Sequence, residues 1–185
     1  MKLAKHFTGH SFRFKKLVLA GSTALALLMT QSAAWADVAA IDKDFILKAA
    51  DAGNTEVKAS TQAQLKSNSP DIKAFADAMV KDHTAVGEEL KKIAMVKGVS
   101  VPVEPSAKHQ SKIDKLNALQ EAKYDQKYVD EIGISAHKDT VALFKKAEKE
   151  VKDPDLKTFI TKTIPSLEHH LKMAEDLKQK VNKAQ

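Results

Sequence analysis

The stretch IKAFADAMVKDHTAVGEELKKI, residues 72–93, decides how this chain folds. Its apolar positions step alternately by four and three residues; they are Ile72, Ala76, Met79, Val86, Leu90 and Ile93. Such spacing places them on one face of an α-helix, which is typical of a helix packed into a bundle. His83 occupies the centre of the same face, so a titratable ring is expected in the core.

The same spacing recurs along most of the chain after residue 40. Long helices are predicted for residues 41–67, 70–98, 124–151 and 154–181, with a short helix at 106–121. The second and fourth long helices open at Ser69-Pro70 and Asp153-Pro154, where a capping side chain precedes a proline at the first helical position. Residues 99–105 contain two prolines and are expected to be extended.

The chain also repeats itself. The heptapeptide SPDIKAF at 69–75 returns as DPDLKTF at 153–159, an offset of 84 residues. We interpret this as two related helical hairpins joined by residues 99–123, a connection long enough to run beside helices that span about 40 Å. A bundle with one long crossover is the ferritin-like arrangement. The predicted fold is therefore all-α, a ferritin-like four-helix bundle with a short fifth helix in the crossover.

The first 36 residues have the pattern of a secretory signal peptide. Five basic residues precede an apolar run of 13 residues at 17–29, and Ala34-Trp35-Ala36 is a cleavage signal. We expect cleavage after Ala36, a mature domain of residues 37–185, and a periplasmic or secreted location. The alternative is an uncleaved membrane anchor, but a span needs about 20 apolar residues.

Composition excludes several kinds of site. The chain has no cysteine, which rules out disulfides, thiolate metal ligands and thiol nucleophiles. The predicted signal peptide holds five of the 30 basic residues and none of the 24 acidic ones, so the mature part carries a formal charge of +1. No basic–aromatic pattern accompanies this balance, so neither a nucleic-acid partner nor a transmembrane span is expected in the mature chain.

Four titratable side chains lie near the middle of separate predicted helices, at positions whose periodicity indicates burial: Glu56, His83, His137 and His170. Their distances from the hairpin turns place all four within about two helical turns of mid-bundle. His169 and His170 cannot both face the core, because helix neighbours lie about 100° apart. His170 is expected inward and His169 at an edge, with His169 kept as the alternative ligand.

Three imidazoles and one carboxylate suit a single Zn, Cu, Ni or Fe ion. A di-iron site is not expected, since such bundles use Glu-x-x-His pairs and the residues three before the histidines are Val80, Ile134 and Leu167. If Glu56 binds the ion, the site is closed; if Glu56 stays off it, one position is open. A metal-free hydrogen-bond network explains the same residues, with Glu56 or Asp82 as the partner of His83.

Two functions follow from these alternatives. One is the binding of a single transition metal, for sequestration, delivery or stress tolerance. The other is a structural or partner-binding role in the cell envelope, in which the polar centre fixes helix register and residues 99–103 dock an unidentified protein. No complete catalytic constellation is visible, so an enzyme is not expected.

Several of these stretches resemble a bacterial family of exported ferritin-like proteins whose activity is not established, often labelled "predicted outer membrane protein". The likeness covers residues 41–177. It rests on Phe75 with the run MVKDH at 79–83, Tyr128 with His137, the pair Leu143-Phe144, and PSLEHHLKMA at 165–174. The resemblance implies the fold and export, and little about activity. Segments that alternate like the strands of an outer-membrane barrel are not found.

Overall fold

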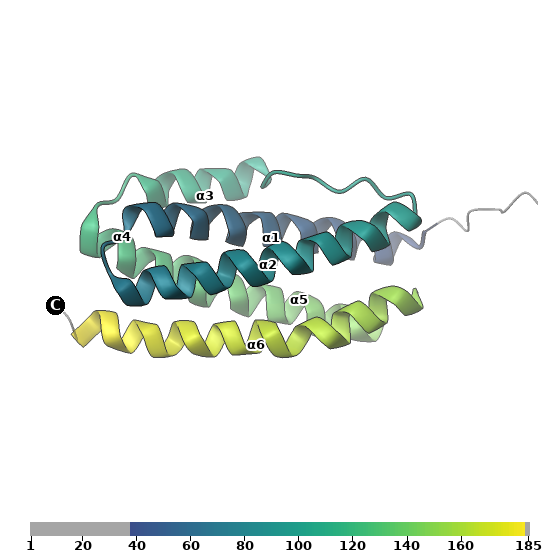
Figure 1. Cartoon of the computed structure of the whole chain (residues 1–185). Helices are drawn as coiled ribbons and strands as arrows, with labels where there is room; N and C mark the ends of the chain where they lie inside the picture. The colour runs from purple at the N-terminus through teal and green to yellow at the C-terminus, as the bar shows by residue number, and fades with distance from the viewer. Residues whose placement is uncertain (1–37, 184–185) are drawn as a thin grey trace, which may run out of the picture. The chain divides into compact units, whose positions relative to one another are not determined.

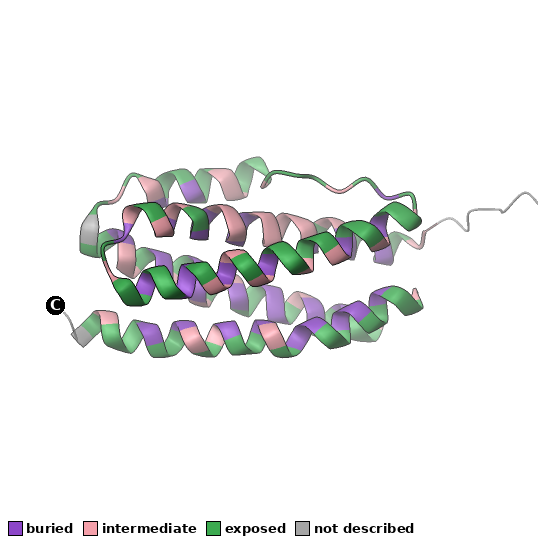
Figure 2. Ribbon diagram, viewed as in Figure 1, coloured by how far each residue is buried: buried purple, intermediate pink, exposed green. Residues whose placement is uncertain are grey.

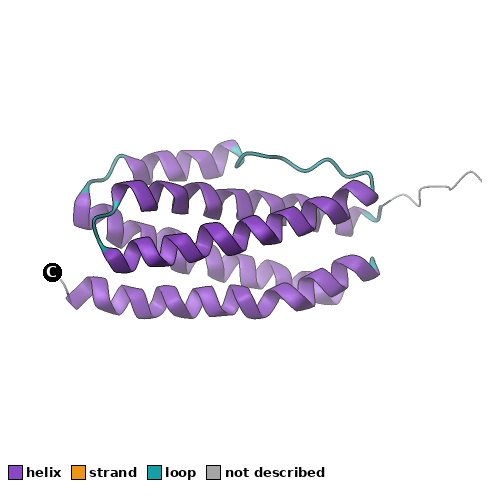
Figure 3. Ribbon diagram, viewed as in Figure 1, coloured by secondary structure: helices purple, strands orange, loops and turns teal. Residues whose placement is uncertain are grey.

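Helices make up nearly all of residues 38–183, the part of the chain that this computed structural model describes, and no strand occurs there (Figure 3). The prediction of an all-helical fold is confirmed. The predicted signal peptide and its cleavage site lie outside the described residues. Within residues 38–183, no helix combines the length and the apolar character that crossing a membrane requires.

Four long helical rods follow one another along the chain (Figure 1). The first two are α1 (Ala40–Lys66) and α2 (Pro70–Val96). The third consists of α4 (Glu121–Tyr128), the π-helix η1 (Val129–Ala136) and α5 (His137–Glu150), and the fourth is α6 (Pro154–Lys183). Helix α1 packs against α2 and α5, and α6 packs against α5 and α2, so the rods surround a shared interior.

The connection between the second and third rods runs back along α1 (Figure 1). Its extended part is tied to α1 by a hydrogen bond from Asn54 Nδ2 to the Pro102 carbonyl (2.9 Å) and by an ion pair between Lys58 and Glu104 (2.7 Å). Helix α3 (Ala107–Asn117) then packs on the outside of α1 through the buried Ile113 and Leu116. The short helix was predicted to reach residue 121, but it ends at Asn117 and a separate helix begins at Glu121.

The helix ends follow ordinary capping chemistry. Ser69 Oγ accepts from the backbone N–H of Ile72 (3.4 Å) at the start of α2, and Asp153 Oδ1 accepts from Leu156 N–H (3.0 Å) at the start of α6. Gly98 has a φ of 68°, the left-handed conformation that ends a helix without a steric penalty for glycine. Lys97 bonds to Asp153 (2.6 Å), which joins the end of α2 to the start of α6.

The core consists of two apolar clusters with a polar layer between them. One cluster gathers around Phe45, Phe144 and Phe159, and the other around Phe75 and Tyr128. Buried positions form a stripe along the inner face of each rod (Figure 2). The buried Glu56 and the three buried histidines belong to neither apolar cluster, and they occupy the middle of this interior.

Candidate metal centre

Each rod contributes one titratable side chain to the polar layer: Glu56 from α1, His83 from α2, His137 from α5 and His170 from α6. None of the four residues is more than 4% exposed. The sequence predicted all four positions as buried, and the structure places them there. The neighbouring His169 lies on the exposed face of α6, so of the two adjacent histidines it is His170 that points inward.

The three buried rings lie next to one another. Their centroids are 5.3 Å apart for His83 and His137, 5.1 Å for His83 and His170, and 5.7 Å for His137 and His170. One ring nitrogen from each histidine lies within 4.8 Å of the other two. Three buried imidazoles at this separation can hold a metal ion.

An oxygen acceptor orients two of these rings through Nδ1. His83 Nδ1 lies 3.0 Å from Glu56 Oε2, and His137 Nδ1 lies 3.0 Å from the carbonyl oxygen of Ile132. Both contacts leave Nε2 free, and the two Nε2 atoms face each other at 3.3 Å. Histidines that bind metals commonly donate their other N–H to a carboxylate or carbonyl, which fixes the ring and its tautomer.

In His170 the nitrogen that faces an oxygen acceptor is Nε2, whereas in His83 and His137 it is Nδ1. His170 Nε2 lies 3.0 Å from Asp82 Oδ2, while His170 Nδ1 is buried and has no hydrogen-bond partner. Asp82 was considered as a partner of His83, and this pairing was wrong. Asp82 precedes His83 by one residue and therefore points about 100° away from it around α2, toward α6. Each of the three imidazoles thus has one nitrogen about 3.0 Å from an oxygen and a second nitrogen with no oxygen partner among the described residues.

The π-helix η1 supplies the carbonyl that holds His137. Ile132 precedes His137 by five residues, and the His137 ring takes the bond to its carbonyl. π-Helical segments are rare and are often found at functional sites. Gly133 lies in the same segment, and a Cβ built there would be 2.8 Å from the Cβ of Ala174 on α6. The space beside Gly133 is therefore filled by Ala174 and the ring of Phe75.

The electrostatics of the layer centre on Glu56. Burial alone would raise the pKa of this carboxyl, but electrostatic interactions with His83 and His137, together with side-chain hydrogen bonding to His83 and Thr140, lower it to about 2. Burial disfavours the charged form of His83, but the Glu56 carboxylate outweighs burial and raises the pKa of His83. Glu56 and His83 therefore form a buried ion pair.

The other two histidines are neutral at pH 7. Burial and the positive charge of His83 lower the pKa of His137, against the effect of Glu56. For His170, burial and His83 together lower the pKa to about 4, although Asp82 acts in the opposite sense. Because the Ile132 carbonyl only accepts, His137 carries its proton on Nδ1 and accepts at Nε2. Nε2 of His83 then donates to His137 (3.3 Å), while its Nδ1 lies 3.0 Å from Glu56 Oε2 as an ion pair.

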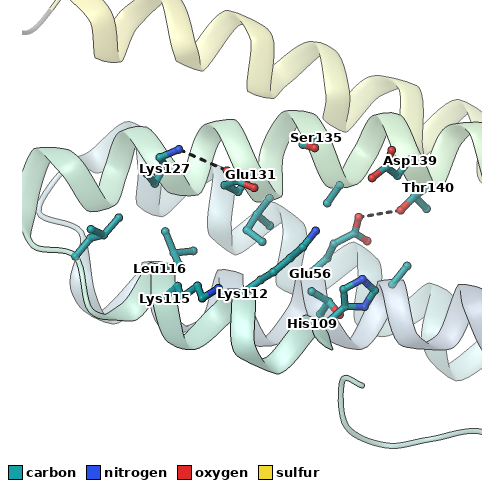
Figure 4. A pocket seen from close by; sticks show the side chains of 15 residues that line it. Glu56, His109, Lys112, Lys115, Leu116, Lys127, Glu131, Ser135, Asp139 and Thr140 are labelled. Atoms are coloured by element: carbon teal, nitrogen blue, oxygen red, sulfur yellow. Dashed lines mark hydrogen bonds and ion pairs between the residues drawn. The ribbon is translucent and has the colours of Figure 1, made fainter. Parts of the chain in front are cut away.

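Two openings approach this layer from the surface. A pocket of about 390 Å³ lies between α1, α3 and the third rod, and it reaches Glu56 and Thr140 (Figure 4). Thr140 Oγ1 donates to Glu56 Oε1 at 3.2 Å. A second opening of about 470 Å³ lies between α1 and α2 beneath residues 101–105, and it reaches His83.

Sequence reasoning missed Thr140 and the carbonyl of Ile132. Thr140 follows His137 by three residues, so both lie on the same side of α5, and this spacing was the available signal. The exposed His169 is not among the side chains whose nitrogens converge. His109 is half-buried and pairs with Asp51 (2.9 Å), and it is not among the converging side chains.

The fold and its centre define the class: an all-helical protein whose interior holds three imidazoles and a carboxylate in contact. The sequence matches the family described as Domain of unknown function (DUF4142) over residues 27–177, and the chain belongs to that family. The expected membership of an uncharacterised domain family is thereby confirmed. Comparison with curated proteins and with solved structures gave no match.

Proposed function

We propose that this chain is an exported, ferritin-like bundle protein that binds one transition-metal ion through His83, His137 and His170. The observation that carries the proposal is the orientation of the three rings. Each has one nitrogen fixed by an oxygen acceptor, and the nitrogens left over belong to rings whose centroids are 5.1–5.7 Å apart. An ion among them would have three protein ligands, each with an oriented ring.

The spacing of two ligand atoms suits a tetrahedral ion. Metal–nitrogen bonds of about 2.0–2.1 Å at a tetrahedral angle put neighbouring ligand atoms about 3.3–3.4 Å apart. His83 Nε2 and His137 Nε2 are 3.3 Å apart, so this pair needs no rearrangement. The ligand nitrogens of the three histidines all lie within 4.8 Å of one another. To reach tetrahedral spacing, the His170 nitrogen would therefore move inward by at most roughly 1.5 Å.

Glu56 supports the ion from outside its ligand shell. Its two oxygens are engaged by His83 Nδ1 and by the hydroxyl of Thr140, on the side of the His83 ring opposite to Nε2. Glu56 was predicted as a possible fourth ligand, and we now assign it to orienting His83. The fourth position of a tetrahedral ion then belongs to water or to an exchangeable ligand, which suits reversible binding and delivery.

Export and the ferritin-like arrangement are part of the same proposal. The basic, apolar and Ala-x-Ala segments of residues 1–36 support a signal peptide and a periplasmic or secreted location. The order of the rods, with one long crossover along α1, supports the ferritin-like topology. In that compartment a cysteine-free imidazole site suits borderline metals such as Zn²⁺ or Cu²⁺, for sequestration or stress tolerance.

The separation of His83 and His137 also supports a second candidate function. At 3.3 Å the two Nε2 atoms can share the proton of a charged His83, which gives a complete network without a metal. The polar layer would then specify which faces of the rods meet, as part of a structural or partner-binding envelope protein.

Metal uptake by the full-length chain, purified without a histidine tag, separates these functions. After chelation and desalting, we expect the protein to retain about one equivalent of added Zn²⁺ and to melt at a higher temperature with it. His83→Ala and His137→Ala should lose this uptake. His109→Ala is the matched control and should keep it, since His109 pairs with Asp51 outside the trio. Unchanged uptake in the first two variants would overturn the assignment.

A further inference from the structure

One side chain connects the buried trio to solvent. Among the described residues that bond to the three rings through side chains, Glu56 is 1% exposed, whereas the side chain of Asp82 is 43% exposed. Its Oδ2 is 3.0 Å from Nε2 of His170, a ring that is itself 2% exposed. Asp82 therefore has its carboxylate partly in water and touches a proposed metal ligand.

Asp82 forms no ion pair with a lysine in the described part of the chain, whereas Glu89, two turns further along α2, pairs with Lys162 (2.8 Å). The one partner of Asp82 is the buried ring of His170, whose Nε2 lies 3.0 Å from Asp82 Oδ2. The carboxylate thus lies at the edge of a polar interior with no lysine against it. The exposed His169 has its ring centroid 6.2 Å from that of His170.

The two openings described above are less suitable than the surface at Asp82 as a path for a cation. The pocket in Figure 4 is lined by Lys112, Lys115 and Lys127 together with acids, and it ends at Glu56 and Thr140 without reaching any of the three rings. The opening beneath residues 101–105 does reach His83, but its lining combines apolar side chains, among them Phe144 and Phe159, with two lysines and two glutamates. The acidic and basic side chains balance, so the lining offers a cation no net attraction.

On the basis of the proposed metal site, we propose that Asp82 is the entry port for the ion: a divalent cation first binds this carboxylate at the α2–α6 surface and then passes to His170. His170 is the ligand that must move to complete the site, so it is suited to receive the ion. In the structure, Nε2 of His170 is hydrogen-bonded to Asp82 Oδ2 (3.0 Å). When the carboxylate takes a cation, that bond is released and the ring becomes free to rotate.

Asp82→Asn separates this role from simple orientation of the ring. The asparagine oxygen still accepts the bond from His170 Nε2–H, but the charge is gone. A port on the path of the ion lowers the barrier to binding and to release. In Asp82→Asn, association and dissociation should therefore both slow by about tenfold or more, with Kd changed by less than about threefold. If Asp82 only orients His170, the asparagine keeps that orientation, so both rates should stay within about threefold of those of the unsubstituted chain.

The test is stopped-flow mixing of the metal-free, untagged full-length chain with Co²⁺, followed by the d–d absorption of the bound ion. Asp77→Asn is the matched control, because Asp77 lies on the same helix, is exposed and accepts a hydrogen bond from Gln64 (2.7 Å). Slower exchange in Asp82→Asn alone supports the port. Equal rates in the two variants, or faster dissociation in Asp82→Asn, would overturn it. Failure of the unsubstituted chain to bind Co²⁺ would instead remove the metal site.

Discussion

Glu56 Oε2 and His83 Nδ1 lie 3.0 Å apart with 1% and 3% of their side chains exposed, and they form the buried ion pair at the centre of this protein. The pair joins the two helices of the first hairpin, since Glu56 is on α1 and His83 on α2. Through His83 Nε2 it also reaches His137 in the second hairpin (3.3 Å). In the proposed metal site, a proton on His83 Nε2 and the ion would compete for the same nitrogen.

Metal uptake should release protons near pH 7. The Glu56 carboxylate raises the pKa of His83, so this ring holds its second proton more tightly than a free imidazole, and an ion bound at Nε2 displaces that proton. The measurement is the absorbance change of an indicator dye in weakly buffered solution on addition of Zn²⁺. With Glu56→Gln fewer protons should be released, because His83 then lacks the carboxylate that raises its pKa. Equal release from the two proteins would contradict the protonation we assign to His83.

Replacing Glu56 by Gln should cost stability but not the site itself. Removing one partner of a buried ion pair costs about 3–5 kcal/mol of unfolding free energy. Since Glu56 orients a ligand rather than binding the ion, metal affinity should weaken by about 10–100-fold and the stoichiometry should stay at one. Urea denaturation and calorimetric titration measure these quantities. Complete loss of uptake in a folded Glu56→Gln variant would instead make Glu56 a ligand.

The metal-free protein should lose stability as the pH falls from 6.5 to 4, in part through His170. Its pKa is lowered to about 4 in the folded chain, whereas the unfolded chain takes up this proton near 6.5. The unfolded state therefore binds more protons in this window, and acidification favours it, by up to about 3 kcal/mol for this group. His170→Gln should flatten the pH dependence of the unfolding free energy. His169→Gln, on the exposed face, is the control, and an equal flattening there would refute the assignment.

Gly133 should tolerate no side chain. A Cβ at this position would lie 2.8 Å from Ala174 Cβ, so Gly133→Ala should destabilise the fold by about 1–3 kcal/mol. Gly53→Ala is the matched control: nothing lies within 4 Å of its Cβ position, and alanine in a helix interior should add about 0.5–1 kcal/mol. Adding Ala174→Gly to Gly133→Ala should restore stability in thermal unfolding. Without that recovery, the contact would not explain the requirement for glycine.

The sequence was sufficient for the rods, because their apolar spacing and the caps at Ser69 and Asp153 are local signals. It also identified Glu56, His83, His137 and His170, since each interrupts an apolar stripe at mid-height. The π-helix was not predictable, because Val129, Gly133 and His137 are spaced by four, as in an ordinary α-helix. The pairing of Asp82 with His170 depends on which rod lies beside α2, and no local pattern contains that information.

Convergence of three ring nitrogens on one ion can be tested by X-ray absorption spectroscopy of the zinc-loaded, untagged chain. We expect four nitrogen or oxygen scatterers at about 2.0–2.1 Å, with outer-shell scattering from three imidazoles. In Glu56→Gln the imidazole number should remain three, and in His137→Ala it should fall. An ion surrounded by six oxygens, or by one imidazole or none, would contradict it.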